Sequence, residues 1–155
     1  MSYVESNLMS GEKIIYKAYI HWFIFLPGII FAALGILLIA ANKQGEGGAT
    51  IGLLLLIYAV ILLLKAFIIK ISTDLAVTSK RVIAKAGFIR RRSVELNHSK
   101  VESFIVNQSI FGRMFNYGTI IVRGTGGGRT GVQGVDSPFD FRKNAMETID
   151  QSQQT

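Results

Sequence analysis

Two long stretches without charge in the first half of the chain constrain its fold more than any other feature. Residues 20–41 contain no Asp, Glu, Lys or Arg, and a helix of that length spans about 33 Å, against a hydrocarbon core of roughly 30 Å. Residues 49–64 are also uncharged, and after Lys65 the apolar sequence continues to Ile69. A secretory signal peptide is the alternative for the first stretch, but its apolar region has only about 7–15 residues. We therefore predict transmembrane helices at residues 20–41 and 49–69.

The residues around these stretches indicate how the helices meet the membrane surface. Residues 42–48 form a short glycine-rich loop, which predicts that the two helices run antiparallel as a hairpin. Trp22 is typical of the aromatic belt at a membrane interface, while Lys65 and Lys70 extend their amines toward the headgroups. We expect these three residues to be interfacial anchors. The pair Pro27-Gly28 is expected to kink the first helix.

The basic residues predict which side of the membrane each segment occupies. Seven of them flank the hairpin on the side of the chain termini, against Lys43 alone in the loop. The seven are Lys13, Lys17, Lys65, Lys70, Lys80, Arg81 and Lys85. Because cytoplasmic segments carry the excess of Lys and Arg, both termini are predicted to be cytoplasmic and residues 42–48 extracytoplasmic. The chain has 17 basic and 10 acidic residues, and the surplus of +7 lies from Lys65 onward, which suits an anionic partner.

After the second stretch the hydrophobic period changes to two, which is typical of half-buried strands. The predicted strands cover residues 69–77, 81–86, 88–96, 101–107, 118–123 and 131–135. Residues 108–116 break the alternation with apolar residues at helical spacing, so a single helical turn or compact loop is expected there. The same period of two from Ile14 to Ile20 leaves two alternatives open for the N-terminal segment. It is either a short strand added to this domain or an interfacial segment on the membrane.

A C-terminal helix is predicted to start at Ser137, with Ser137 as N-cap, Pro138 in the first position and Asp140 near the positive end of the helix dipole. Its apolar stripe consists of Phe141, Ala145 and Ile149, with Met146 beside it. Such a stripe must cover an apolar surface, and the open end of a curled sheet is the expected one. The whole organisation comprises an N-terminal segment at 1–19, the hairpin, a cytoplasmic domain at 70–150 and a frayed tail at 151–155.

The sequence gives little support to an enzyme. It contains no cysteine, so a thiolate nucleophile, an iron–sulfur cluster or a cysteine zinc site is excluded. His21 and His98 are far apart, and the acidic residues are scattered. The glycine run at 124–131 lacks the Gly-Lys-Ser/Thr that leads into a helix in a P-loop, so a hairpin turn is expected there. We predict no catalytic, cofactor-binding or metal-ligating residues.

The run Arg90-Arg91-Arg92 is the sharpest electrostatic feature of the predicted domain. One interpretation is a solvated strand edge that prevents aggregation. The other is contact with anionic headgroups, because each Lys or Arg near such a leaflet gains about 1 kcal/mol. With Lys80 and Arg81, these arginines are the candidate contacts for anionic lipid or a partner. Nucleic acid is not expected, because the basic strand carries no aromatic platform.

Several segments together resemble the bacterial pleckstrin-homology-like proteins of the membrane-anchored branch, which have two transmembrane helices. The resemblance covers nearly the whole chain. Its segments are Gly11-Glu12-Lys13-Ile14, Val77-Thr78-Ser79-Lys80-Arg81-Val82-Ile83, Gly87, Val94-Glu95-Leu96, Lys100-Val101-Glu102-Ser103, Gln108-Ser109-Ile110-Phe111-Gly112-Arg113-Met114-Phe115-Asn116-Tyr117-Gly118-Thr119 and Gly124-Thr125-Gly126-Gly127. The implied fold is an α+β membrane protein: a two-helix transmembrane hairpin, then a partly open β-barrel of two near-orthogonal antiparallel sheets, capped by a C-terminal helix.

The resemblance also implies a binding or scaffolding module without enzymatic activity. Eukaryotic relatives bind phosphoinositides through a basic loop between the first two strands, which here contains Ser79, Lys80 and Arg81. Some bacterial relatives assemble into rings, so a homo-oligomer is a further expectation. We therefore expect an adaptor in the bacterial inner membrane that recognises a membrane or cytoplasmic protein, anionic phospholipid, or both. The alternative is an accessory subunit of a membrane complex or transporter that acts through its hairpin.

Overall fold

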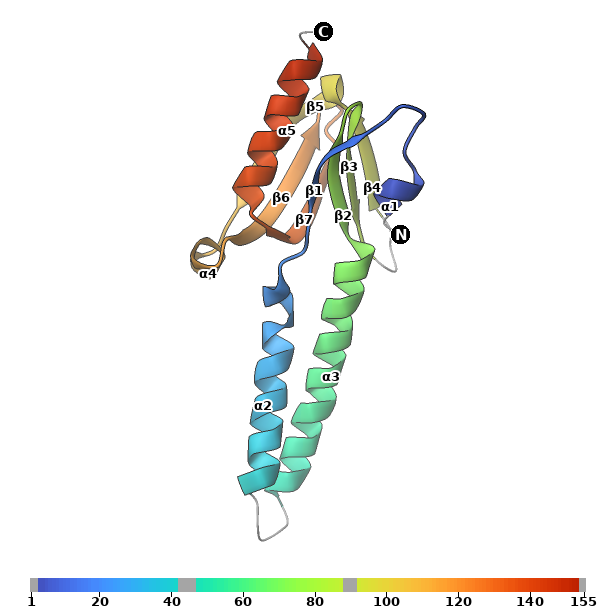
Figure 1. Cartoon of the computed structure of the whole chain (residues 1–155). Coiled ribbons are helices and arrows are strands. Elements are labelled where there is room, and N and C mark those ends of the chain that lie inside the picture. The colour runs from blue at the N-terminus through green and yellow to red at the C-terminus, as the bar shows by residue number, and fades with distance from the viewer. Residues whose placement is uncertain (1–2, 42–46, 88–91, 154–155) are drawn as a thin grey trace. The chain divides into compact units, whose positions relative to one another are not determined.

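A helical hairpin is inserted in the sequence between two parts of one β-domain (Figure 1). The hairpin comprises Trp22–Lys70, and the β-domain combines Met1–His21 with Ile71–Thr155. The computed structural model describes residues 3–41, 47–87 and 92–153. Residues 42–46 of the predicted loop at 42–48 and the first two arginines of the Arg90–Arg92 run lie outside the described residues.

The hairpin contains two helices that are long and apolar enough to cross a membrane, Trp22–Ala41 and Gly48–Ser72. The first begins as the 3-10 turn η1 (Trp22–Phe25) and continues as α2 (Leu26–Ala41), and the second is α3 (Gly48–Ser72). Pro27 lies in the first turn of α2, where backbone N–H groups need no intrahelical acceptor. The proline therefore stands at the change from 3-10 to α geometry and not at a kink within a continuous helix.

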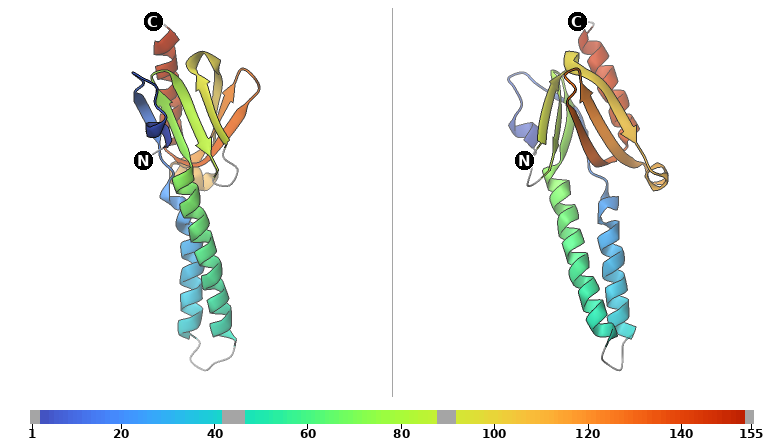
Figure 2. Two further views of the ribbon diagram at one scale, coloured as in Figure 1. Left: turned by 90° about the vertical axis from the view of Figure 1, so that its right-hand side faces the viewer. Right: turned by 180° about the vertical axis from the view of Figure 1, so that it is seen from behind.

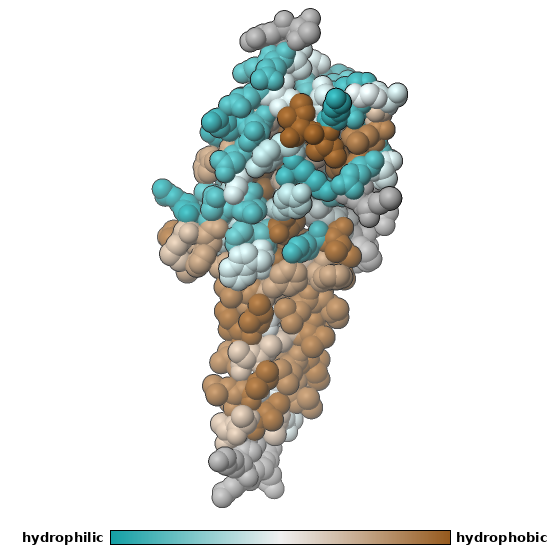
Figure 3. Space-filling view, viewed as in Figure 1, coloured by the Kyte–Doolittle hydropathy of each residue, from teal (hydrophilic) through white to brown (hydrophobic). Residues whose placement is uncertain are grey.

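Small residues spaced by seven line the contact between α2 and α3. They are Gly28 and Gly35 on α2, with Gly52, Ala59 and Ala66 on α3, and all are buried. A Cβ added at Gly35 would lie 2.8 Å from the carbonyl oxygen of Gly52, and one added at Gly52 would lie 2.8 Å from that of Gly35. Close approach of helices through small residues is typical of membrane proteins. The large apolar side chains point outward, and the hairpin surface is correspondingly hydrophobic in Figure 3.

The first sheet of the β-domain has the order β1-β2-β3-β4, with all neighbours antiparallel. Its strands are β1 (Ile14–Ala18), β2 (Asp74–Thr78), β3 (Arg81–Ala86) and β4 (Arg92–Asn97). The pairing of β1 with β2 shows that the N-terminal segment is a strand of this domain, the first of the two alternatives. The predicted strand at 69–77 was wrong at its start, because α3 continues to Ser72 and the strand begins at Asp74.

The N-terminal turn α1 (Tyr3–Ser6) covers one face of this sheet. Val4 is fully buried there against Ala76 and Ile83. Because α1 and β1 precede the hairpin in the sequence, the β-domain core needs residues from both sides of the hairpin.

The second sheet has the order β5-β6-β7, also antiparallel. Its strands are β5 (Val101–Asn107), β6 (Tyr117–Gly124) and β7 (Arg129–Asp136). The 3-10 turn η2 (His98–Lys100) precedes β5, and the short helix α4 (Ile110–Met114) connects β5 to β6. An isolated bridge pairs Ile20 with Val135, so the chain beyond β1 runs against the second sheet. The fold is thus α+β with two antiparallel sheets and a barrel that is not closed.

Helix α5 (Pro138–Gln153) packs against β1, β5 and β6 (Figure 2). Its buried stripe of Phe141, Ala145 and Ile149 confirms the predicted one, and Phe141 packs edge-on against Tyr16 and Phe104, with ring centroids 5.9 and 6.1 Å apart. Met146 is 47% exposed and does not belong to that face. The helix therefore contributes its stripe to the core that both sheets share.

The residue that precedes α5 differs in detail from the predicted cap. The carbonyl of Ser137 accepts the Phe141 N–H, which places Ser137 at the N-cap position. Its hydroxyl, however, donates to the Asp136 carboxylate and accepts from the Asn116 amide. Ser137 and Asn116 both have positive φ, 47° and 55°. Their hydrogen bonds therefore hold an unfavourable backbone turn at the start of the helix.

Candidate functional site

The strand register divides the β-domain into two ends. The end at which the chain passes to and from the helical hairpin is called the exit end. There Ala18, near the end of β1, pairs with Leu75, near the start of β2. Asp74 pairs with Lys85, and Ala86 pairs with Arg92 at the start of β4. The β3–β4 connection, which carries the arginine run, therefore returns to the exit end.

The second sheet brings its own connection to the same end. Tyr117 pairs with Asp136, and Ile20 bridges to Val135 next to it. The His21 ring stacks on the Tyr117 ring with centroids 5.5 Å apart. Helix α4 ends just before Tyr117, so it also belongs to the exit end.

The distal end, opposite the exit end, gathers the remaining connections. It contains the β2–β3 turn at Ser79 and Lys80, the turn η2, and the glycine hairpin between β6 and β7. The Thr125 N–H donates to the Lys100 carbonyl, which ties the last two together. Since β2 has five residues and a strand rises about 3.3 Å per residue, roughly 16 Å separates the two ends.

Arg81, at the start of β3, is committed to a buried ion-pair network. Arg81 is only 6% exposed. The guanidinium donates through Nε to Glu12 Oε1 and through Nη2 to Glu12 Oε2, both at 3.0 Å. It also donates through Nη1 to the Glu95 carboxylate. Nη2 also donates to the Asn7 carbonyl at 2.7 Å. The donors of Arg81 are thus directed into the protein, and the expected contact of Arg81 with anionic lipid or a partner stays a prediction.

Glu12 is the residue that the sequence analysis missed in this network. Burial opposes its ionisation, but hydrogen bonds from Arg81, the Met9 N–H and Thr78 outweigh burial and hold the pKa of Glu12 below its ordinary 4.5. Glu12 is separated from Arg81 by the entire hairpin, so no local pattern pairs them. The Gly11-Glu12 motif was noted only as part of a family resemblance.

Other residues of the distal end also bind to the protein itself. The Lys80 amine donates to the Ser10 carbonyl at 3.0 Å, while its side chain remains exposed. His98 Nε2 donates to the Thr78 carbonyl at 3.0 Å, and its Nδ1 lies 2.8 Å from the Ser152 hydroxyl. Burial lowers the pKa of His98, although the hydrogen bond to Thr78 opposes that shift. The β2–β3 turn is thus fastened to the N-terminal segment.

The arginine run lies at the other end of the first sheet. Arg90 and Arg91 lie outside the described residues, and Arg92 is the first residue of β4. Arg92 pairs with Ala86 at the exit end. The structure therefore separates the described candidate contacts: Lys80 is distal, Arg81 is internal, and Arg92 is at the exit end.

The three candidate interfacial anchors belong to the hairpin. Trp22 is 54% exposed in the first residue of η1. Lys65 and Lys70 are exposed on α3, and the Lys70 amine lies 5.6 Å from the centroid of the Phe25 ring. Lys70 and Trp22 are thus both close in sequence to the boundaries of the β-domain.

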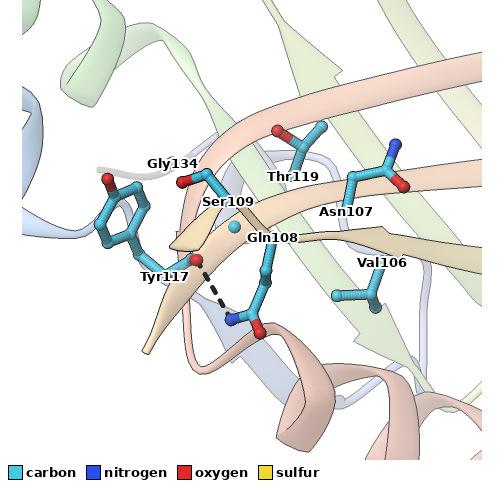
Figure 4. A pocket seen from close by; sticks show the side chains of 8 residues that line it. Val106, Asn107, Gln108, Ser109, Tyr117, Thr119 and Gly134 are labelled. Carbon is cyan, nitrogen blue, oxygen red and sulfur yellow. Dashed lines mark hydrogen bonds between the residues drawn. The ribbon is translucent and has the colours of Figure 1, made fainter. Parts of the chain in front are cut away.

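An open recess lies beside α4, between the end of β5 and the start of β6 (Figure 4). Asn107, Gln108, Ser109, Tyr117 and Thr119 line it together with Val106, Gly118 and Gly134. The Gln108 amide donates to the Tyr117 carbonyl at 3.1 Å. The lining side chains carry hydroxyl and amide groups without Asp, Glu, Lys or Arg, so the recess is neutral and suits hydrogen bonding more than anion binding.

Comparison with known proteins identifies the family. The family described as Bacterial PH domain matches residues 22–154. No curated protein and no solved structure matches the chain significantly. The match leaves out β1, although β1 completes the first sheet. Since it covers most of the chain, including both sheets and the C-terminal helix, the chain belongs to the bacterial pleckstrin-homology (PH) domain family.

Proposed function

We propose that this protein is a membrane-anchored binding module without enzymatic activity, held at the cytoplasmic face of the bacterial inner membrane. Two features of the hairpin support the anchor. Its helices bury only 11% and 17% of their most apolar windows, and the outward side chains are large and apolar, which a water-exposed hairpin does not tolerate. The excess of basic residues on the terminal side supports cytoplasmic termini.

The position of the arginine run carries the proposal for a ligand. Both connections to the hairpin belong to the exit end of the β-domain, and so does Arg92, the last residue of the Arg90–Arg92 run. A domain tethered at that end presents the run to the leaflet from which its helices emerge. Anionic phospholipid headgroups are therefore the proposed ligand, with about 1 kcal/mol gained for each arginine.

A protein partner is supported by a different surface. An open groove runs along α5 and is lined by Phe104, Phe139, Arg142 and Met146, together with Ser103, Lys143, Glu147 and Asp150. Phe139 and Met146 are 48% and 47% exposed, and the Arg142 guanidinium lies 5.4 Å from the centroid of the Phe139 ring. Exposed aromatic and Met side chains beside Arg are the composition that protein interfaces favour. An adaptor would use this groove while its exit end contacts lipid.

The lipid arm is tested by vesicle co-sedimentation of a soluble β-domain. Residues 1–21 are joined to residues 71–155 by a flexible Gly/Ser linker, because β1 and Glu12 are part of the fold, and circular dichroism verifies that the protein folds. Binding to anionic vesicles should weaken when salt shortens the Debye length from about 10 Å at 0.1 M to about 3 Å at 1 M. Changing Arg90, Arg91 and Arg92 to Gln should remove most of the salt-dependent part, whereas Lys80→Gln should leave it unchanged. Equal binding of the triple variant and the wild type would refute the headgroup role.

A further inference from the structure

Helix α4 exposes almost all of its apolar side chains. Ile110, Phe111 and Met114 are 85%, 60% and 65% exposed, and Phe115 just after the helix is 39% exposed. In the described part of the β-domain this is a dense run of large apolar groups outside the core. Such a surface in water is unfavourable unless another phase or molecule covers it.

The backbone of α4 is held by polar groups and a glycine, so its apolar side chains are not required to build it. The Ser109 hydroxyl caps the helix by accepting the Gly112 N–H at 3.1 Å. The Gln108 amide donates to the Tyr117 carbonyl, as described above. A Cβ at Gly112 would lie 2.5 Å from the Tyr117 carbonyl oxygen, so a larger residue does not fit. The helix is therefore a preformed support for exposed apolar side chains. Figure 1 shows that its ribbon stands apart from the strands.

The strand register places α4 next to the chain segment that leads into the hairpin. Tyr117 follows α4 by three residues and stacks on His21, and the next residue after His21 begins the first helix of the hairpin. Asp136 is the partner of Tyr117 in β7, and its N–H donates to the carbonyl of Tyr19, two residues before His21. Helix α4 is thus fixed to the segment of chain that enters the hairpin.

The charge on this segment also suits a lipid surface. From Ser103 to Val135 the sequence contains no Asp or Glu, and α4 itself carries Arg113. An apolar group flanked by an arginine fits the interfacial layer, where the apolar part lies about 5–10 Å deep and the guanidinium stays among the headgroups.

We propose that α4 inserts Ile110, Phe111 and Met114 into the interfacial layer of the leaflet that the hairpin enters. This inference rests on the proposed membrane anchor. It adds a third attachment of the β-domain to the bilayer, beyond the two covalent connections. Arg113 contributes a headgroup contact that is separate from the Arg90–Arg92 run.

The test uses the full chain in liposomes, where the absence of native cysteine allows single-site labelling. An environment-sensitive fluorophore is attached at Phe111→Cys or Met114→Cys, with Ser99→Cys in η2 as the distal control. Trp22, the single tryptophan, reports on the anchor in each sample. Nitroxide lipids should quench the labels at 111 and 114 and shift their emission to the blue, while the label at 99 stays unquenched.

The outcomes distinguish the inference from the anchor on which it rests. Quenching of Trp22 without quenching at 111 and 114 would overturn the role of α4 and retain the anchor. A blue shift at these sites without lipid quenching would also overturn it, because a second copy or another protein would then cover α4. Absence of Trp22 quenching would refute the anchor itself. The labelled positions are largely exposed, so circular dichroism should match the wild type.

Discussion

Both ends of the β-domain contain basic residues, but these residues have different surroundings at the two ends. At the distal end, Arg81 is surrounded by Glu12, Glu95 and a backbone carbonyl, and Lys80 donates to Ser10. At the exit end, α4 exposes large apolar side chains, and Arg92 pairs with Ala86 at the end where the chain passes to the hairpin. A basic residue thus identifies a binding surface only after its acidic partners in the fold are known.

The Arg81 network also explains why the segment before the hairpin belongs to the domain. Glu12 accepts from Arg81, Thr78 and the Met9 N–H, so removing residues 1–21 would leave a buried guanidinium without its main carboxylate. A fragment that starts at Lys70 lacks β1 as well. The distal end is therefore a clasp between two sequence-distant parts of the chain.

The largest expected effect comes from the core that both ends share. Phe141 is fully buried, and replacing a buried Phe by Ala costs about 3–5 kcal/mol, out of about 5–15 kcal/mol for a typical domain. Phe141→Ala should therefore unfold much of the linked β-domain in denaturant titrations. Phe139→Ala on the same helix is the control, because Phe139 is 48% exposed and should cost far less. Equal losses would show that α5 is not packed through its stripe.

A slightly smaller effect is expected from breaking the distal clasp. Glu12→Ala removes one carboxylate from the buried Arg81 and leaves its ion pair with Glu95, and loss of one partner of a buried pair costs about 3 kcal/mol or more. The unfolding midpoint in denaturant measures it. Glu147→Ala is the matched control, since its pair with Lys143 is exposed at 4.0 Å and contributes less than about 1 kcal/mol. Similar midpoints for the two variants would contradict a buried network.

The distal end should also make the domain sensitive to acid in two steps. The pKa of His98 is lowered from 6.5, so its neutral form is favoured by folding and stability falls as the pH drops below 6.5. The pKa of Glu12 is lowered from 4.5, so its contribution is complete above 4.5 and is lost as the pH falls through the folded-state pKa. Denaturant titrations at several pH values should show that His98→Gln flattens the upper step and Glu12→Gln the lower. Unchanged slopes in both variants would argue against these assignments.

The smallest effect is expected one residue before Arg81. Lys80 is exposed, and its bond to Ser10 is a surface contact, so Lys80→Gln should change stability by less than about 0.5 kcal/mol. Arg81→Gln, measured in parallel by thermal unfolding, should be strongly destabilising because Glu12 and Glu95 lose their cation. A large loss for Lys80→Gln would mean that the turn depends on its charge.

Much of this fold follows from local patterns. Alternation of apolar residues predicted β3 and β5 with their bounds, and the spacing of Phe141, Ala145 and Ile149 predicted the buried face of α5. The start of β2 was missed because Ile69 and Ile71 fit a strand by alternation and a helix by apolar continuity. Tertiary context decided for the helix, which continues to Ser72.

The candidate site was less predictable because it depends on register and long-range pairing. Nothing near Arg81 in the sequence indicates that Glu12, on the far side of the hairpin, neutralises it. Likewise, the helical spacing around Phe111 predicted a turn but not which side chains would remain exposed. The side of α4 that faces the protein is set by the close approach of Gly112 to the Tyr117 carbonyl, which is a tertiary contact.

We propose that the exit end of the β-domain faces the membrane and that the distal end does not. Full chains in liposomes, spin-labelled at Ala86→Cys or Thr125→Cys, are compared by paramagnetic relaxation from a nickel-chelating lipid headgroup. With roughly 16 Å between the two ends, we expect strong relaxation at residue 86 and little at residue 125. Equal relaxation at both sites, or stronger relaxation at residue 125, would contradict it.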